Sequence, residues 1–282
     1  MVAVLAAIGI SALCPARADP PIRIVSLNLC TDQILVDLVP RARIAAVTTL
    51  AIDPTVSASP EKFAGLATTR GLAEDVLARD PDLIIAGAYT TPATVDLLRR
   101  LGRRVVVVPL PGSVAGVREV ITSLANAVEE PAAGARLVAE MEARINSVRT
   151  RVAAISPRPS ALVYQANNYT AGRGTLVEEA LDIAGYRNAS GTIRSFANGQ
   201  TALETIIAAP PDVMILASEP GDATSTAAAN LRHPALARLL VHMPHMVLPW
   251  SQWLCGTHTI ATAIERLADG QAMVVRPPSR QP

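Results

Sequence analysis

Two glutamates occupy the same place in a repeated stretch of this chain. Glu74 and Glu204 each stand seven positions before a Pro-Asp pair, Pro81-Asp82 and Pro211-Asp212, and each pair opens an apolar run. Surface carboxylates can form charge-assisted contacts with a partner that carries basic groups at matching places. The repeat therefore predicts two lobes built alike and a partner that touches both, which favours a binding protein over a one-site enzyme.

The cysteines are few and far apart. Cys30 and Cys255 lie near opposite ends of the chain, in what the pattern predicts to be different lobes. In an oxidising compartment they could form a disulfide that would lock the lobes together. Two small, half-buried free thiols are the favoured interpretation. A disulfide, a ligand contact and a metal contact are the alternatives.

Histidines offer little for a metal site. The chain has four, which are His233, His242, His245 and His258. Pro244 argues against a helix that would aim His242 and His245 at one ion, and no carboxylate cluster accompanies them. We therefore predict no bare metal site. An axial contact from His258 or Cys255 to a bound chelate stays an alternative.

Aromatic residues make up 3% of the chain, and several fall in predicted loops after strands. Aromatic walls suit a large, flat or greasy ligand. Loops at the carboxyl ends of parallel strands converge on a common crevice, which also brings in polar residues that precede the first helix of each lobe. The predicted ligand-contacting residues are Asn28, Cys30, Tyr89, Tyr169, Arg173, Phe196, Trp250 and Trp253.

The elements that would position these residues form two β-α series. The first has predicted strands at 22–27, 43–47, 83–86 and 104–108, with helices at 33–39 and 92–101. The last two strands are continuous apolar runs of the kind buried in parallel sheets. Strand, helix, strand in this order predicts a parallel α/β lobe.

The second series follows a helical pattern at 131–155 with apolar residues at three- and four-residue spacing, ended by Pro157 and Pro159. Strands are predicted at 160–165, 213–217 and 245–248, and a last helix at 257–268. Thr175 to Glu178 and Thr201 to Glu204 read as capping boxes, the first opening a helix that ends at Gly185.

We therefore expect an α/β protein of two Rossmann-like lobes with parallel sheets, joined by one long rigid helix, with a ligand cleft between the lobes. The predicted division is an N-terminal lobe at 19–112, a helical connector at 113–155, a C-terminal lobe at 156–276 and a loose tail at 277–282. Residues 1–18 read as a signal peptide cleaved near Ala18, because an apolar run precedes the small-x-small pattern Ala16-Arg17-Ala18.

Composition and motifs argue against other function classes. A net charge of +1 with 17% charged residues gives no electrostatic footprint for nucleic acid. The chain lacks the G-x-S-x-G elbow, the Walker phosphate loop, a complete G-x-G-x-x-G and H-E-x-x-H. We expect no catalytic residues and no intrinsic cofactor, although an exported α/β enzyme stays an alternative, because the fold alone excludes no chemistry.

The order of these motifs resembles the class III periplasmic substrate-binding proteins, which deliver ferric siderophores, haem and cobalamin to ABC importers. The matching stretches are Arg23 to Asn28, Gly71 to Glu74 before Pro81-Asp82, residues 101–108, the long helix, and Glu204 before Pro211-Asp212. They cover nearly the whole chain after the signal peptide. Each is unspecific alone, but their order and spacing together are specific.

The resemblance implies a function and a partner. The chain would be a monomeric periplasmic protein that captures an iron-siderophore or cobalamin-type metal chelate between its lobes, with haem as the alternative ligand. Glu74 and Glu204 match the family glutamates that dock on the two subunits of an inner-membrane permease. The ATP-hydrolysing step would belong to the importer.

Overall fold

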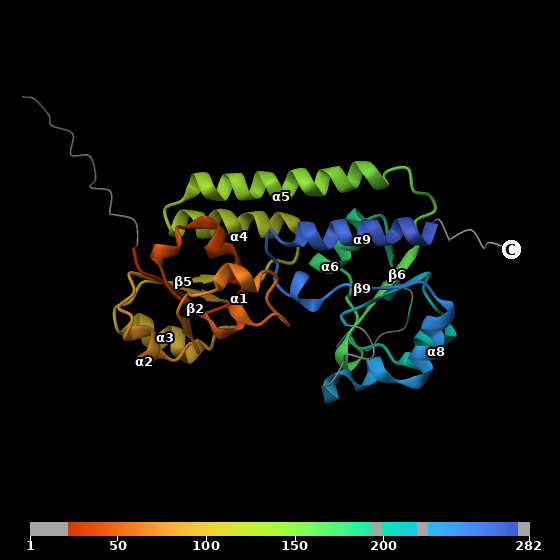
Figure 1. Cartoon of the computed structure of the whole chain (residues 1–282), viewed down its shortest axis with the longest axis horizontal. Helices are drawn as coiled ribbons and strands as arrows, with labels where there is room; N and C mark the ends of the chain where they lie inside the picture. The colour runs from red at the N-terminus through yellow and green to blue at the C-terminus, as the bar shows by residue number, and fades with distance from the viewer. Residues whose placement is uncertain (1–21, 192, 194–198, 219–224, 276–282) are drawn as a thin grey trace, which may run out of the picture.

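The computed structural model describes residues 22–191, 193, 199–218 and 225–275, which form two α/β lobes beneath a long helix, α5 (Pro131–Val152), that reaches over both (Figure 1). Within these residues each lobe is built on one parallel sheet. The predicted α/β class with two parallel-sheet lobes is therefore confirmed.

The first lobe holds a five-stranded sheet in the order β3-β2-β1-β4-β5. Its strands are β1 (Ile24–Ser26), β2 (Ile44–Thr48), β3 (Thr68–Thr69), β4 (Leu83–Gly87) and β5 (Val105–Val108), and its helices are α1 (Leu29–Leu38), α2 (Ala73–Leu77) and α3 (Pro92–Arg100). Every residue of β1 and β4 is buried. Both faces of these strands lie under other elements, which explains why their sequences are continuous runs with little polar alternation.

The second lobe repeats this plan with a four-stranded sheet in the order β7-β6-β8-β9. Its strands are β6 (Ser160–Tyr164), β7 (Arg187–Asn188), β8 (Val213–Leu216) and β9 (His245–Val247), and its helices are α6 (Leu176–Ile183), α7 (Leu203–Ala208) and α8 (Pro234–His242). In each lobe the first strand pairs with the strand that follows the repeated Pro-Asp, β1 with β4 and β6 with β8.

The aspartate of each repeat forms hydrogen bonds with residues at the start of the first strand of its lobe. Asp82 Oδ2 accepts hydrogen bonds from the backbone N–H groups of Ile22 at 3.0 Å and Arg23 at 2.9 Å. Asp212 Oδ2 accepts from the N–H and the hydroxyl of Ser160, each at 2.7 Å. The repeated Pro-Asp is therefore a structural device that sets strand register in both sheets.

Two helices link the lobes where one was expected. α4 (Val114–Ala127) and α5 follow one another with a sharp turn between them, in which Glu129 has φ of 61° and Pro131 opens α5. Gly134 lets the two helices approach closely, because a Cβ there would lie 2.4 Å from the Ala125 methyl. The expected single connecting helix is thus corrected to a packed helix pair.

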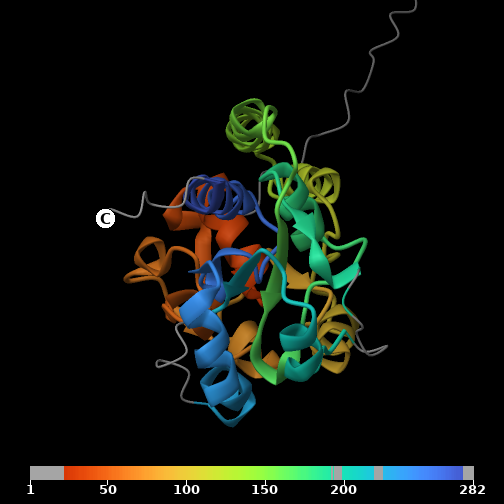
Figure 2. The same ribbon diagram turned by 90° about the vertical axis from the view of Figure 1, so that its right-hand side faces the viewer.

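The C-terminal helix α9 (Ile260–Val275) lies along α5 on its lobe-two half. Figure 2 views α5 and α9 nearly end-on and shows them on the same side of both sheets. Arg144 of α5 forms a two-pronged ion pair with Glu265 of α9, at 2.9 and 2.5 Å. The apolar face predicted for the long helix is buried as expected, at Leu137, Met141, Ile145, Val148 and Val152.

Two predicted helix starts differ from the structure. α1 begins at Leu29 rather than at residue 33, because the Asn28 side chain caps the helix by accepting from the Cys30 N–H at 2.9 Å. The capping box predicted at Thr201 is wrong: Ala202 stands at the N-cap of α7 without a side-chain bond, and the Thr201 hydroxyl lies 3.2 Å from that of Thr170.

The predicted signal peptide and loose tail lie outside the described residues. Among those described, no helix is both long enough and apolar enough to cross a bilayer.

Candidate ligand cleft

A cavity of about 550 Å³ opens between the lobes. The first lobe contributes Pro54 and Thr55 to its wall. The second lobe contributes the segment after β6, the loop after β8 and the segment that follows β9. Because these segments follow parallel strands, the cavity lies where strand-end loops converge, as the fold class predicts.

Two of the five predicted aromatic residues line this cavity. Tyr169 and Trp250 form part of its wall, and Tyr169 keeps 43% of its surface exposed. Tyr89 lies just after β4, where it is 81% exposed and borders a smaller cavity lined mainly by lobe one. Phe196 falls outside the described residues.

Trp253 corrects the prediction made for it. Its side chain is only 4% exposed and packs in the main apolar core, and its indole Nε1–H is buried without a hydrogen-bond partner. The ring therefore stabilises the segment before α9 instead of contacting a ligand. No local pattern distinguishes Trp253 from Trp250, since both stand in the same predicted loop.

Asn28 and Cys30 border the smaller cavity with Tyr89. The Asn28 amide lies against Gly87, where a Cβ would stand 2.5 Å from Asn28 Cγ. This close approach requires glycine and fixes the Asn28 side chain at the helix start. Asn28 thus lies at this smaller cavity, and its side-chain oxygen serves as the helix cap.

Cys30 and Cys255 form a disulfide, which corrects the favoured expectation of free thiols. The bond joins the first turn of α1 to the segment before α9, across a sequence separation of 225 residues. Cys255 is 1% exposed. Neither sulfur is therefore a free thiol that could ligate a metal chelate.

Arg173 lies away from the cavity of Tyr169 and Trp250. It borders a separate polar pocket of about 710 Å³ together with Arg158, Asp182 and Arg187. Its guanidinium packs over Gly191, where a Cβ would lie 2.8 Å from Nε. The ligand contact predicted for Arg173 stays a prediction, and the structure places its side chain at this second pocket.

The histidines also take structural positions. His258 Nε2 lies 3.1 Å from Asp37 Oδ2, and His233 Nδ1 accepts from the Ala235 N–H at the start of α8. Among the described residues, no group of three or more His, Cys, Asp or Glu is arranged to hold a metal ion. The disulfide excludes the axial contact considered for Cys255, and the one considered for His258 stays a prediction.

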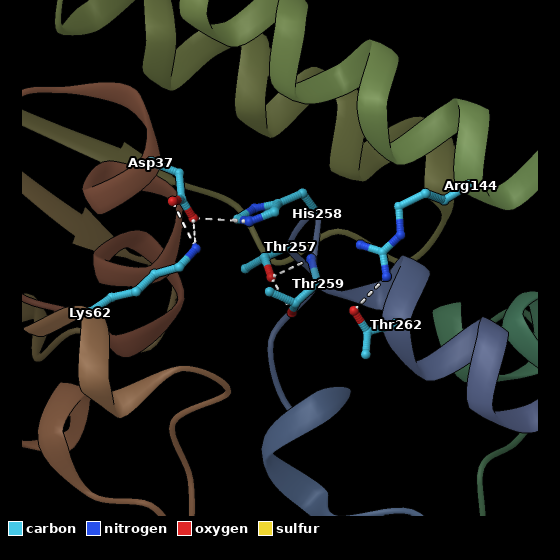
Figure 3. Close-up of polar contacts among 7 residues, drawn as sticks. All are labelled: Asp37, Lys62, Arg144, Thr257, His258, Thr259 and Thr262. Atoms are coloured by element: carbon cyan, nitrogen blue, oxygen red, sulfur yellow. Dashed lines mark hydrogen bonds and ion pairs between the residues drawn. The ribbon is translucent and has the colours of Figure 1, made fainter.

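Asp37, Lys62 and His258 form a polar cluster that joins the lobes (Figure 3). Lys62 Nζ donates to both Asp37 oxygens at 2.8 Å. Burial would raise the pKa of the Asp37 carboxyl, but hydrogen bonds from His258 and Lys62 outweigh it and hold that pKa below its ordinary range. Sequence reasoning missed this cluster, although Lys62 is the only lysine in the chain.

Asp32 is a second carboxylate that sequence reasoning missed. It is completely buried between α1 and β2, where Oδ2 accepts from the Thr48 N–H at 3.1 Å and hydroxyl at 2.5 Å. Oδ1 has no hydrogen-bond partner. Burial raises the pKa of Asp32 to about 7, because the hydrogen bonds that it accepts only partly offset the lost hydration.

Glu74 and Glu204 occupy equivalent exposed positions. Each is the second residue of the short helix, α2 or α7, that precedes the Pro-Asp strand of its lobe. In both helices the residue before the glutamate and the second residue after it are buried. The matching burial leaves both carboxylates on the outward face of the same helix in each lobe.

Comparison with known proteins gives consistent similarities. Residues 24–239 match the family model described as periplasmic binding protein. A cobalamin-binding protein of Halobacterium salinarum is 27% identical over 211 residues, covering 73% of this chain but only 57% of the relative. The chain therefore spans less than two thirds of that relative's length.

Solved structures share the fold over almost the whole chain. The periplasmic heme-binding protein RhuT from Roseiflexus sp. RS-1 matches 90% of this chain and 99% of its own, with a TM-score of 0.72 and 25% identity. The periplasmic vitamin B12 binding protein BtuF of Vibrio cholerae matches 91% of this chain and 99% of its own, with a TM-score of 0.67 and 17% identity. The latter similarity concerns the fold alone.

Proposed function

This chain belongs to the periplasmic binding protein family, and we propose that it is the binding component of an ABC importer for a corrinoid or haem, held between its two lobes. The observation that carries this proposal is the cavity of about 550 Å³ with Tyr169 and Trp250 in its wall. Exposed aromatic rings offer flat apolar surface to a planar macrocycle. The relatives named for cobalamin and heme support the same ligand class.

The proposal places the protein in the periplasm after removal of residues 1–18. The Cys30–Cys255 disulfide is consistent with this compartment, because disulfides persist where the environment is oxidising. The protein would bind and release its ligand without making or breaking a covalent bond.

Delivery would use the two exposed glutamates. Glu74 and Glu204 lie on equivalent helices, so a permease dimer with a basic pocket on each subunit can contact both at once. The absence of the predicted capping box favours this role for Glu204. Helix α7 has no side-chain cap, so the Glu204 carboxylate is not needed as the second half of a capping box. Two charge-assisted contacts would orient the cleft over the transport path.

A spectroscopic titration tests the ligand class. Purified protein is mixed with cyanocobalamin, haemin or a ferric hydroxamate siderophore, passed through a desalting column, and examined by visible absorption and native mass spectrometry. We expect one corrinoid or haemin molecule to remain bound per chain. Retention of the siderophore alone would redirect the proposal to open-chain chelates, and retention of none would overturn it.

A further inference from the structure

Helix α1 of lobe one is attached at both of its ends to one short segment of lobe two. Cys30, in its first turn, is bonded to Cys255, and Asp37, in its last turn, contacts His258. Asp37 lies seven positions after Cys30 along the α-helix, a rise of about 10 Å. The 255–258 segment leads directly into α9, which packs on α5. Both attachments therefore connect α1 to a segment that is continuous with the packed helix α9.

The polar attachment is partly shielded from water. The His258 side chain is 13% exposed and that of Asp37 is 23% exposed, while Lys62 places its ammonium group against the same carboxylate (Figure 3). Ion pairs at exposed surfaces contribute little to stability, but partial burial reduces screening by solvent and salt. The contact is thus better placed to hold two elements together than a bridge on the open surface.

The 255–258 segment is also pressed against the first lobe between these two attachments. A Cβ on Gly256 would lie 2.4 Å from Pro111 Cγ and 3.3 Å from Leu176 Cδ2. Only glycine permits this approach without a shift of the neighbours. Pro111 follows β5 of lobe one and Leu176 opens α6 of lobe two, so the segment sits in contact with both lobes.

The segment is continuous with the walls of the cleft. Gly256 and Cys30 border the same cavity as Asn28 and Tyr89. Trp250, five positions before Cys255, lines the larger cavity. A change in the position of the 255–258 segment would therefore move wall residues of both cavities.

We propose that the Cys30–Cys255 disulfide and the Asp37–His258 contact are positioning pairs that hold the two lobes at their ligand-binding separation, and we call these four residues the interlobe lock. Two attachments about 10 Å apart along α1 restrict the orientation of the 255–258 segment more than one bond alone would. When the cavity wall is already fixed before binding, less binding free energy is lost to ordering that wall as the ligand enters. The identity of the ligand in this inference rests on the proposed function, whereas the fixed separation of the lobes is independent of that function.

Dissociation kinetics of the intact mature protein test the lock. The variants are Cys30→Ser/Cys255→Ser, Asp37→Asn and the combination of all three, compared with wild type before and after treatment with a phosphine reductant. Cyanocobalamin and haemin serve as probes in separate stopped-flow displacement experiments. We expect the release rate of the bound probe to rise about tenfold when either attachment is lost, and further when both are lost, because lost preorganisation acts mainly on release.

A rescue separates positioning from general stability. Reduced wild type is re-bridged with diiodomethane, which joins the two thiolates through one methylene and releases two iodide ions. We expect this bridge to restore slow release. Asp80→Asn is the matched control, because it removes an ion pair with Arg103 that is internal to lobe one. Its release rate should equal that of wild type.

Small-angle X-ray scattering and hydrogen exchange without ligand give a readout independent of the probe. Loss of both attachments should increase the radius of gyration and speed exchange in α1 and at 255–260. Unchanged release, scattering and exchange in the triple variant would overturn the lock. If wild type binds neither probe, the proposed function fails, while scattering and exchange still decide whether the lobes are held.

Discussion

Asp212 binds Ser160 twice, through the backbone N–H and through the hydroxyl, at 2.7 Å each. These bonds from Ser160 hold the pKa of the Asp212 carboxyl below its usual range. Asp82 makes the equivalent contact in the first lobe, with the N–H groups of Ile22 and Arg23. In each sheet an aspartate at the start of one strand thus sets the start of its neighbour.

Replacing Asp212 by alanine should destabilise the second lobe. We expect Asp212→Ala to lower the free energy of unfolding by about 1–2 kcal/mol at pH 7, the usual range for hydrogen bonds to a charged group in partial contact with water. Asp96→Ala, an exposed position on α3, is the control. Urea denaturation followed by circular dichroism measures both. Because the folded pKa is depressed, the difference should shrink as the pH falls below about 3.8, and a constant difference would contradict the assignment.

Removing the two carboxylates proposed to dock on the permease should separate ligand binding from transport. We expect Glu74→Ala/Glu204→Ala to bind cyanocobalamin or haemin with wild-type affinity while uptake through its importer falls by at least about tenfold, since both charge-assisted contacts are lost. Glu119→Ala, on the exposed face of α4, is the control. Weakened ligand binding in the double variant would show that the glutamates act at the cleft, and undiminished uptake would refute docking.

The two tryptophans of one loop should behave differently. Trp250→Ala removes a ring from the cavity wall. It should weaken binding of the chelate that wild type retains, cyanocobalamin or haemin, by about 1–2 kcal/mol, or roughly five- to thirtyfold in Kd. Trp253→Phe alters a core residue, so we expect a lower melting temperature with an unchanged Kd. Fluorescence or absorption titration beside thermal melts tests the pair. Equal effects on Kd would show that the cavity is misassigned.

Asp32 should make the protein less stable as the pH rises. Its folded pKa of about 7 lies above the ordinary value of 3.8, so between these values the folded state holds a proton that the unfolded state has released. Stability contributed by the neutral carboxyl is then lost as pH rises toward 7, by at most about 1.4 kcal/mol per pH unit. The isosteric, uncharged Asp32→Asn should remove this dependence. Its melting temperature relative to wild type should increase from pH 5 to pH 8, whereas parallel profiles would exclude a neutral Asp32.

Elements whose signals are local could be predicted from the sequence. The Pro-Asp repeat, the apolar strands and the helical spacing of Leu137, Met141 and Ile145 each depend on neighbours close in the chain. The capping box at Thr201 failed because that hydroxyl lies against Thr170, in a contact between segments 31 residues apart. Local patterns carry no information about a competing hydrogen-bond partner from a distant segment.

The site was less predictable for the same reason. Whether Trp250 or Trp253 faces the cavity depends on how the loop before α9 turns, and the partner of Cys30 depends on where that loop meets α1. Asp37 and His258 are far apart in sequence and ordinary in type. Nothing in the spacing of these residues distinguishes a contact between lobes from a pair of solvated surface residues.

The disulfide also changes the unfolded chain. A bond between residues 225 positions apart turns most of the polypeptide into a closed ring. By the chain-entropy model such a ring restricts the denatured ensemble enough to favour the native state by about 5 kcal/mol. A proteolytic cut anywhere between Cys30 and Cys255 would still leave one covalent molecule, so the lobes stay tethered even when the α4–α5 connection is severed.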